Sequence, residues 1–350
     1  MKPSKGLVLF LVLSILGISF TFYAYQIVYT PNVLVEKEDK VIIIPEDATF
    51  KSVQAQLHEG RYVEDLVSFS FLARLMDYDK AIKPGRYVLE ANMTNLQAIR
   101  LLRSGNQVPV NVTFNNIRTI DELAEKITRN LLMTPEEFRA GLIKYAMNNS
   151  AGFNENTVIA MFLPNTYEIY YNITPDGLTQ RMFNEYELFW NEQRKSKAKE
   201  IGLTPIQVSI LASIVQAETI KEDEAPLVAS LYSNRLKSGM PLQADPTLKF
   251  ALGDFTIKRI LNVHKEVDSP YNTYLHAGLP PGPINMPEIW ALNAVLNHKQ
   301  TDYYYMCAKE DFSGYHNFSN SYQQHMRNAK RYQDALTREQ RKGALQKRLN

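Results

Sequence analysis

One glutamate stands where a helical pattern calls for another aliphatic residue. Isoleucines recur every four residues at Ile206, Ile210 and Ile214, and the next step of that stripe falls on Glu218. Burial disfavours the charged form of a carboxyl group and raises its pKa, so a glutamate placed there can stay protonated near neutral pH. Such a group can donate a proton to a glycosidic oxygen and then accept one as a carboxylate.

The position of Glu218 also permits a plainer interpretation. The predicted helix begins at a capping box, Thr204-Pro205-Ile206-Gln207, and Glu218 lies near its end. Glutamates at helix ends often reach solvent or a salt bridge. Position alone therefore leaves a structural role and a chemical role open.

Three loops follow that helix and suit a binding cleft. A second helix, near residues 224–237, is predicted to stop at Gly239. Segments 240–247, 269–274 and 278–284 are then dense in proline and glycine, yet they carry amide, hydroxyl and aromatic groups. Loops of this kind can hold sugar hydroxyls and N-acetyl groups, although each one alone also fits an ordinary turn.

Several side chains in and after these loops are candidates for substrate contact. We select Gln243, Asp245, Tyr271, Asn272, Thr273 and His316. Asp245 is also a candidate second carboxylate, and a helix cap or loop brace before Pro246 explains it equally well. His316 could orient a group in the cleft, or it could be a partly buried histidine with its hydrogen bonds satisfied.

Composition argues against several other functions. The net charge of +2, from 39 basic and 37 acidic side chains, gives no reason to expect a nucleic-acid partner. The single cysteine, Cys307, excludes an intrachain disulfide, and its apolar surroundings predict a buried strand with a structural thiol. His264 and His276 lack metal-ligand spacing with nearby acids. We therefore expect no metal and no cofactor.

The amino-terminal segment predicts a membrane anchor. Residues 6–29 carry no charge and are long enough to cross the hydrocarbon core as a helix. Lys2 and Lys5 precede them, which places a short tail, residues 1–5, in the cytoplasm and the remainder outside. A cleaved signal peptide is the alternative, but its apolar stretch would be shorter and would end in a small-x-small site.

The exported part is predicted to be α+β. A polar linker over residues 30–40 leads to a strand, two helices, a strand and a closing helix, which form a small module over residues 41–107. A second small α+β segment covers residues 108–158. A larger mixed α+β domain, residues 159–340, contains Glu218.

Two local features are expected in that larger domain. The segment Leu163-Pro164-Asn165-Thr166-Tyr167 predicts a turn, because it pairs proline with asparagine. Residues 175–197 predict one long helix.

Taken together in this order and spacing, several segments resemble the MltG (YceG-like) family of endolytic murein transglycosylases. The segments are SIVQAET (213–219), SNRL (233–236), GMPLQADPT (239–247), SPYNTY (269–274), GLPPGPI (278–284), KQTDYYY (299–305) and YHNFS (315–319). The resemblance covers the chain from about residue 160 to residue 330.

The resemblance implies a fold, a reaction and a location. It implies that the module over 41–107 is LysM-like and that the chain is a single-pass protein of the bacterial inner (cytoplasmic) membrane, with its catalytic domain on the periplasmic side. The reaction would cleave the β-1,4 bond between N-acetylmuramic acid and N-acetylglucosamine in peptidoglycan strands and leave 1,6-anhydro ends. Glu218 would be the catalytic acid and base, and cell-wall synthesis enzymes are possible partners.

The reaction implied by the resemblance agrees with a single acidic group. An ordinary glycosidase needs two carboxyl groups that flank the bond. If the 6-hydroxyl of the sugar is itself the nucleophile, one carboxyl group acting first as acid and then as base suffices.

This chain departs from the family pattern at two positions, and two other functions stay open. Gln216 stands where the family usually has glutamate, and Asn165 where it tends to have aspartate. One alternative is a muramidase-type hydrolase that uses Glu218 with Asp245. The other is a non-catalytic scaffold that binds peptidoglycan.

Overall fold

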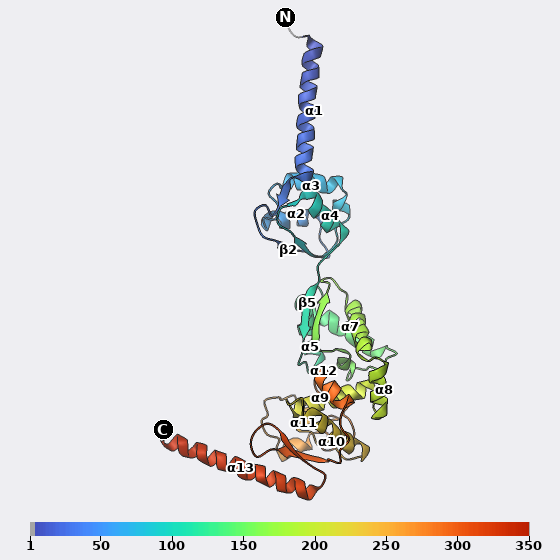
Figure 1. Cartoon of the computed structure of the whole chain (residues 1–350). Coiled ribbons are helices and arrows are strands. Elements are labelled where there is room, and N and C mark those ends of the chain that lie inside the picture. Colours follow the sequence, from blue (N-terminus) through green and yellow to red (C-terminus); the bar gives the residue numbers. More distant parts are fainter. Residues whose placement is uncertain (1–3, 350) are drawn as a thin grey trace. The chain divides into compact units, whose positions relative to one another are not determined.

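The computed structural model describes residues 4–349 and forms two compact units (Figure 1). The first unit contains the described residues up to 112 together with 130–134 and 167–174, and the second contains the rest. Most of the predicted cytoplasmic tail, residues 1–5, lies outside the described residues.

Helix α1 (Lys5–Tyr29) covers the predicted anchor segment. Ser4 caps its start by accepting a hydrogen bond from the Leu7 amide, and Ile27 is its only buried residue among those described. The helix is long and apolar enough to cross a membrane. The prediction of an apolar helix over residues 6–29 is therefore confirmed.

A small module follows α1 in the first unit. Its elements are β1 (Pro31–Val33), β2 (Lys40–Ile44), α2 (Phe50–Glu59), α3 (Leu66–Leu75), η1 (Tyr78–Lys80), β3 (Gly85–Leu89), β4 (Met93–Thr94) and α4 (Asn95–Ser104). Strand β1 thus lies within the predicted linker and pairs with β4. Strands β2 and β3 are antiparallel, with Ile42 opposite Tyr87, and two helices connect them.

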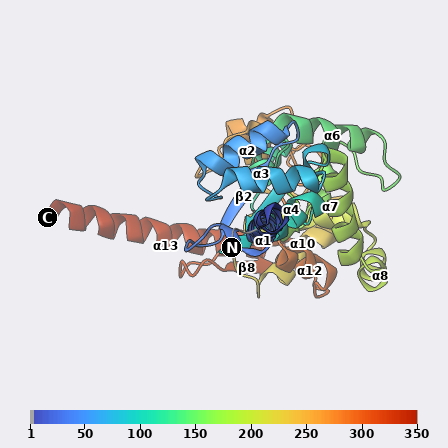
Figure 2. The same cartoon turned by 90° about the horizontal axis from the view of Figure 1, so that it is seen from above.

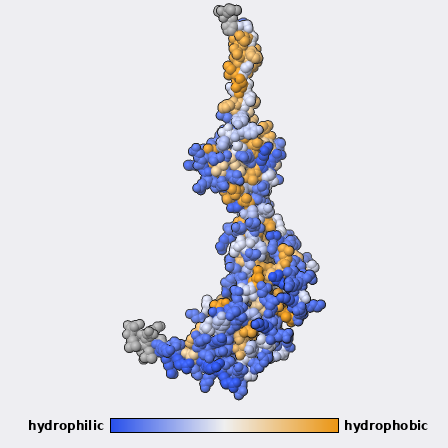
Figure 3. Space-filling model, in the orientation of Figure 1, coloured by the Kyte–Doolittle hydropathy of each residue, from blue (hydrophilic) through white to orange (hydrophobic). Residues whose placement is uncertain are grey.

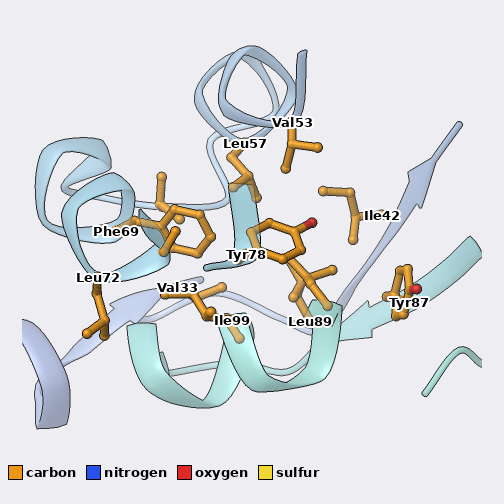
Figure 4. Close-up of a cluster of buried hydrophobic side chains, with 14 of the residues drawn as sticks. Val33, Ile42, Val53, Leu57, Phe69, Leu72, Tyr78, Tyr87, Leu89 and Ile99 are labelled. Carbon is orange, nitrogen blue, oxygen red and sulfur yellow. The ribbon is translucent and has the colours of Figure 1, made fainter. Parts of the chain in front are cut away.

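The core of the module lies between its strands and helices. Figure 4 shows Ile42 and Leu89 from the strands, Leu57 from α2, Phe69 from α3 and Ile99 from α4 pointing toward one another. All five side chains are at most 1% exposed. The alternation of β2 and the helical spacing of α2 and α4 supply these inward faces.

A buried amide network joins the end of α1 to this module. The Asn95 side chain donates from Nδ2 to the carbonyl of Ile27 at 3.0 Å and to the Ser68 hydroxyl at 3.2 Å. Its Oδ1 accepts from Asn32 at 2.7 Å. Helix α1 accordingly packs on α3 and α4. Figure 2 views α1 along its axis, next to these two helices.

The rest of the chain is mostly helical. Its elements are β5 (Val110–Phe114), α5 (Ile120–Thr128), α6 (Pro135–Met147), η2 (Val158–Met161), β6 (Asn165–Ile169), α7 (Pro175–Phe189), α8 (Glu192–Glu200), α9 (Pro205–Glu218), α10 (Ala225–Lys237), α11 (Asp245–Leu252), η3 (Asn262–Glu266), α12 (Ile289–Leu296), β7 (Tyr305–Ala308), β8 (His316–Ser319) and α13 (Tyr322–Leu349). Strand β7 pairs antiparallel with β8, and α13 packs on both.

Two local predictions were wrong. Residues 165–169 form strand β6, which pairs with β5, so this long-range pairing overrides the turn chemistry of Pro164 and Asn165. The helix predicted over 175–197 is two helices, because Asn191 caps a new helix by accepting from the Arg194 amide at 3.0 Å, and Trp190 is fully buried at the break.

Helix α9 is the central helix of the second unit. Apolar side chains are buried on all of its sides, including Val208, Leu211 and Ile214, because α10, α11 and α12 all pack on it. Ser213 is also buried, and its hydroxyl accepts from the Ile284 amide at 3.0 Å. The predicted capping box at Thr204 is present. The prediction of a helix that begins at this capping box and ends near Glu218 is therefore confirmed.

Candidate active site

Glu218 is the last residue of α9 and lies on the wall of a cavity of about 230 Å³. The end of α9, one face of α10, the segment before α11, and strands β7 and β8 form this cavity. Its lining residues are Glu218, Leu231, Tyr232, Arg235, Leu242, Gln243, Asp245, Tyr274, Met306, Cys307, Ala308 and His316. The structure thus brings Gln243, Asp245 and His316 together with Glu218.

The Glu218 carboxyl is held in a largely desolvated position. The residue keeps some exposed surface because it lines the cavity, but protein atoms surround the carboxyl group itself. The Tyr232 hydroxyl, on α10, donates to Glu218 Oε1 at 2.8 Å. Tyr232 is 2% exposed, so this hydrogen bond is sheltered from water.

Burial has the largest effect on this group and raises the pKa of Glu218 from 4.5 to about 7. The hydrogen bond from Tyr232 lowers the pKa, the nearby Asp245 raises it, and His316 and Arg235 lower it. Near neutral pH the carboxyl is thus divided between its acidic and basic forms, which is what one group needs in order to serve as acid and then as base.

Arg235 links α10 to two other segments that line the cavity. It lies on α10 and is 8% exposed. Its guanidinium donates to the carbonyls of Tyr304 at 2.8 Å, Leu242 at 2.6 Å and Pro241 at 3.3 Å. The segment before α11 and the start of β7 are thereby tied to α10. Arg235 accordingly shapes the cavity through backbone contacts.

Asp245 and Gln243 lie on the segment that Arg235 secures. Asp245 is exposed, and its Oδ1 accepts from the Tyr274 hydroxyl at 2.5 Å. Its side chain does not cap α11. Gln243 is exposed and adopts a left-handed backbone conformation, with φ of 51°. Its backbone N–H donates a hydrogen bond to the Thr273 carbonyl. Both side chains are therefore available to a bound molecule.

A buried carboxylate holds His316 in the cavity wall. Glu224 is 4% exposed and accepts from the His316 amide at 2.6 Å, from His316 Nδ1 at 2.8 Å and from the Thr219 hydroxyl at 3.1 Å. Burial raises the pKa of Glu224, but these hydrogen bonds outweigh it and the pKa is lowered overall. The bond at Nδ1 leaves Nε2 as the histidine nitrogen that can meet a ligand.

Three other predicted contact residues do not line this cavity. Asn272 is fully buried, and its Nδ2 donates to the carbonyls of Lys265 and Val267, both at 2.9 Å. Thr273 is 2% exposed and accepts from the Ala244 amide at 3.0 Å. The Tyr271 ring packs on Phe250, with 4.7 Å between ring centroids. Their contact with a substrate stays a prediction.

Gln216 and Asn165, the two departures from the family pattern, each accept a hydrogen bond from a backbone amide. Gln216 Oε1 accepts from the Glu288 amide at 2.6 Å, at the start of α12. Asn165 begins β6, and its Oδ1 accepts from the Thr166 amide at 2.8 Å.

The prediction of a buried thiol was wrong. Cys307 is only half-buried, and it lines the cavity together with its neighbours Met306 and Ala308 on β7. Within residues 4–349, no three His, Cys, Asp or Glu side chains are grouped closely enough to hold a metal ion.

Sequence reasoning missed Tyr232, Arg235, Tyr274 and Glu224. One signal was present for Arg235, which falls on the face of α10 that also carries Val228 and Leu231, where an apolar residue is expected. A buried arginine needs several hydrogen-bond acceptors for its guanidinium group, so its presence on this face indicates a polar site. The other three lacked a comparable signal.

The fold and the cavity together define an α+β protein with one buried, readily protonated carboxyl group. The chain belongs to the YceG-like family, whose sequence model matches residues 42–331. The family predicted from the sequence is therefore confirmed.

Related proteins agree with this assignment. The chain is 24% identical over 344 residues to an endolytic murein transglycosylase of Streptococcus pneumoniae, covering 88% of this chain and 61% of the relative. It thus spans about three fifths of that relative's length. It is 38% identical over 120 residues to an endolytic murein transglycosylase of Bacillus subtilis, covering 34% of this chain and 33% of the relative.

A solved structure shares the fold. The crystal structure of a YceG-like protein from Listeria monocytogenes aligns with a TM-score of 0.52 and 24% identity. The alignment covers 83% of this chain and 98% of the Listeria chain. At this identity the likeness supports the mixed α+β fold.

The raised pKa of Glu218 predicts a pH-dependent effect of Glu218→Gln on stability. Below pH 4.5 the carboxyl is neutral in both the folded and unfolded states, so the variant and the wild type should melt alike. Between pH 4.5 and about 7 ionisation favours the unfolded state, and wild type should lose up to about 3 kcal/mol relative to the variant.

Calorimetric melting of the two proteins from pH 4 to pH 8 measures this difference. Glu222→Gln is the matched control, because Glu222 is an exposed carboxylate four residues away. A Glu218→Gln effect that does not change with pH would show that the carboxyl has an ordinary pKa.

Proposed function

We propose that this chain is an endolytic murein transglycosylase with Glu218 as its catalytic acid and base. The observation that carries the proposal is the buried Glu218 carboxyl, with a pKa of about 7, on the wall of a polar cavity. Membership of the YceG-like family and the names of the relatives supply the substrate class, the murein glycan strand.

The proposed reaction needs one carboxyl group and no water. Protonated Glu218 donates its proton to the oxygen that links C1 of N-acetylmuramic acid to C4 of N-acetylglucosamine. As the C1–O bond breaks, the 6-hydroxyl of the same muramoyl residue forms a new bond to C1 and passes its proton to the Glu218 carboxylate. The acid is restored, and the products carry a 1,6-anhydro end and a free 4-hydroxyl.

The neighbours of Glu218 have distinct roles in this proposal. Tyr232 keeps the carboxyl in place and stabilises the carboxylate formed after proton donation. Gln243, Asp245 and the Nε2 atom of His316 contact sugar substituents, because they line the same cavity. Asn272 and Thr273 hold the loops that shape the cavity, as their bonds to backbone groups indicate.

The anchor and the module would hold this site near the membrane. We propose that α1 spans the inner membrane once, with the catalytic unit on the periplasmic side. The strand–helix–helix–strand order of β2, α2, α3 and β3 is consistent with a LysM-like module. Cell-wall synthesis enzymes that extend glycan strands at the same membrane are the partners that such a location favours.

A hydrolase is the second candidate, because Asp245 lines the cavity together with Glu218. In that reaction Asp245 would assist a water molecule and the product would have a reducing end. A scaffold that only binds glycan would leave the strand intact.

Mass analysis of murein digests separates these functions. Wild type should release fragments whose muramoyl ends are lighter by one water than reducing ends. Glu218→Gln should lower the cleavage rate by about 10²-fold or more, since it removes the proton donor. Glu222→Gln, the exposed control, should cleave at the wild-type rate.

Each alternative has its own result in that experiment. Reducing ends in the wild-type digest would favour the hydrolase. Intact strands with every variant, despite folded protein that binds glycan, would favour the scaffold.

A further inference from the structure

A second cavity, of about 260 Å³, is lined in part by residues that are next in sequence to residues of the Glu218 cavity. Gln216 and Ala217 line it and immediately precede Glu218, while Pro246 lines it and immediately follows Asp245. Both cavities are therefore lined by the end of α9 and by the start of α11.

Two cationic side chains line this second cavity, and no Asp or Glu does. They are Arg118 and Lys249, and neither forms an ion pair with any described residue. The Glu122 carboxylate bonds to the backbone amide of Arg118 at 2.7 Å. The Arg118 guanidinium lies 4.3 Å from the centroid of the Phe255 ring, which fixes its plane and leaves its edge N–H groups for a ligand.

A largely buried asparagine also lines this cavity. Asn285 is 7% exposed and lines it, and its Nδ2 donates to the Ser213 carbonyl at 2.9 Å. Asn285 Oδ1 is buried without a hydrogen-bond partner among the described residues. This oxygen only accepts hydrogen bonds and so cannot pair with a carboxylate, which leaves Arg118 and Lys249 as the cationic groups of this cavity that can recognise an anion.

We propose that this second cavity is an anion subsite that binds a carboxylate carried by a muramoyl residue next to the cleaved bond. The proposal rests on the proposed function, because that function supplies a glycan whose sugar backbone is neutral. The carboxylates of such a strand belong to the peptide stems, or to the lactyl group where a stem has been removed. Arg118 and Lys249 recognise that carboxylate.

Binding of short, fluorescently labelled glycan strands, followed by anisotropy, tests this subsite. All proteins carry Glu218→Gln, so that no strand is cut during the measurement. Strands with native peptide stems are compared with strands whose stem carboxylates are converted to methylamides, and with strands stripped of peptide. Arg118→Gln/Lys249→Gln is compared with Lys258→Gln/Arg259→Gln, which removes the same charge from exposed positions outside the cavity.

The cavity variant should bind native strands about tenfold more weakly than its parent, because two charge-assisted contacts are lost. Its affinity for methylamidated strands should equal that of the parent, and the control should match the parent throughout. Equal binding of native and methylamidated strands by the parent, together with binding of stripped strands that does not depend on Arg118 and Lys249, would overturn the proposal. So would an equal loss for both kinds of strand in the cavity variant.

The stripped strands identify which carboxylate is bound. Tight binding of stripped strands that depends on Arg118 and Lys249 supports the subsite and assigns it to the lactyl group, whereas weak binding assigns it to the stem. Failure of the proposed function is seen separately, as absence of cleavage by wild type, and leaves the binding result unaffected.

A different observation carries a second inference, which concerns helix α3. Phe69, Leu72 and Ala73 face the core, yet Val67, Phe71 and Leu75 on its other side are 75%, 59% and 70% exposed. These three recur every four residues and form one apolar stripe. A ten-residue helix that is apolar on both faces is unusual at a water-exposed surface.

The stripe belongs to the helix on which the apolar anchor packs. Helix α1 contacts α3, and α3 lies at the end of the module where α1 enters it (Figure 1). In Figure 3, apolar surface is present on the module beside the end of α1. Helix α3 contains no acidic residue, and its only charged residue, Arg74, is exposed.

We further infer that α3 lies in the headgroup region of the bilayer that α1 spans, with Val67, Phe71 and Leu75 inserted among the lipids. An amphipathic helix beside a membrane-spanning one gains from burying such a stripe at the interface, and Arg74 can meet anionic lipid headgroups. The contact would fix the orientation of the module against the membrane.

Fluorescence of single labels in proteoliposomes tests this placement. Cys307→Ala removes the native thiol, and Phe71→Cys or Asn106→Cys then carries an environment-sensitive dye. Asn106 is an exposed control beyond the opposite end of α4 from the Asn95–Ile27 contact. Bromine-labelled lipids should quench the dye at 71 and leave the dye at 106 unquenched. Equal, unquenched emission from both sites would refute the inference.

Discussion

The rest of the structure depends on the Glu218 carboxyl, which is desolvated although it lies on the wall of a cavity. Desolvation raises the pKa of Glu218 and favours its protonated form, while the hydrogen bond from Tyr232 lowers the pKa and stabilises the carboxylate. These opposing effects require a rigid support. Helix α9 supplies it, since its apolar side chains are buried all round and its last residue is therefore fixed in position.

The cavity walls depend on side chains that bond to backbone groups. Arg235 ties α10 to the segment before α11 and to the start of β7. Glu224 holds β8 through His316, and Thr273 holds the amide of Ala244. The proline-rich loops offer few backbone hydrogen bonds of their own, so buried polar side chains replace them. A polar cavity with a defined shape follows from these contacts.

The sequence was informative where neighbours along the chain determine the outcome. Helical periodicity predicted α9 and the unusual place of Glu218, because contacts within a helix repeat with a known spacing. The hydrogen bond from Tyr232 arises from packing between two helices, which that periodicity does not specify. Strand β6 was missed for the same reason, since its partner β5 lies far away in sequence. The amide of Asn272 suits contact with a sugar, but no sequence pattern indicated that it is used within the loop.

The protonation of Glu218 itself is the most direct test of this account. Infrared difference spectra of protein with ¹³C-labelled glutamate, recorded across pH and compared with Glu218→Gln, isolate the carboxyl band of this residue. The band should titrate with a pKa near 7 in wild type and at a higher pH in Tyr232→Phe, which lacks the hydrogen bond to the carboxylate. A pKa near 4.5 in both proteins would contradict this expectation.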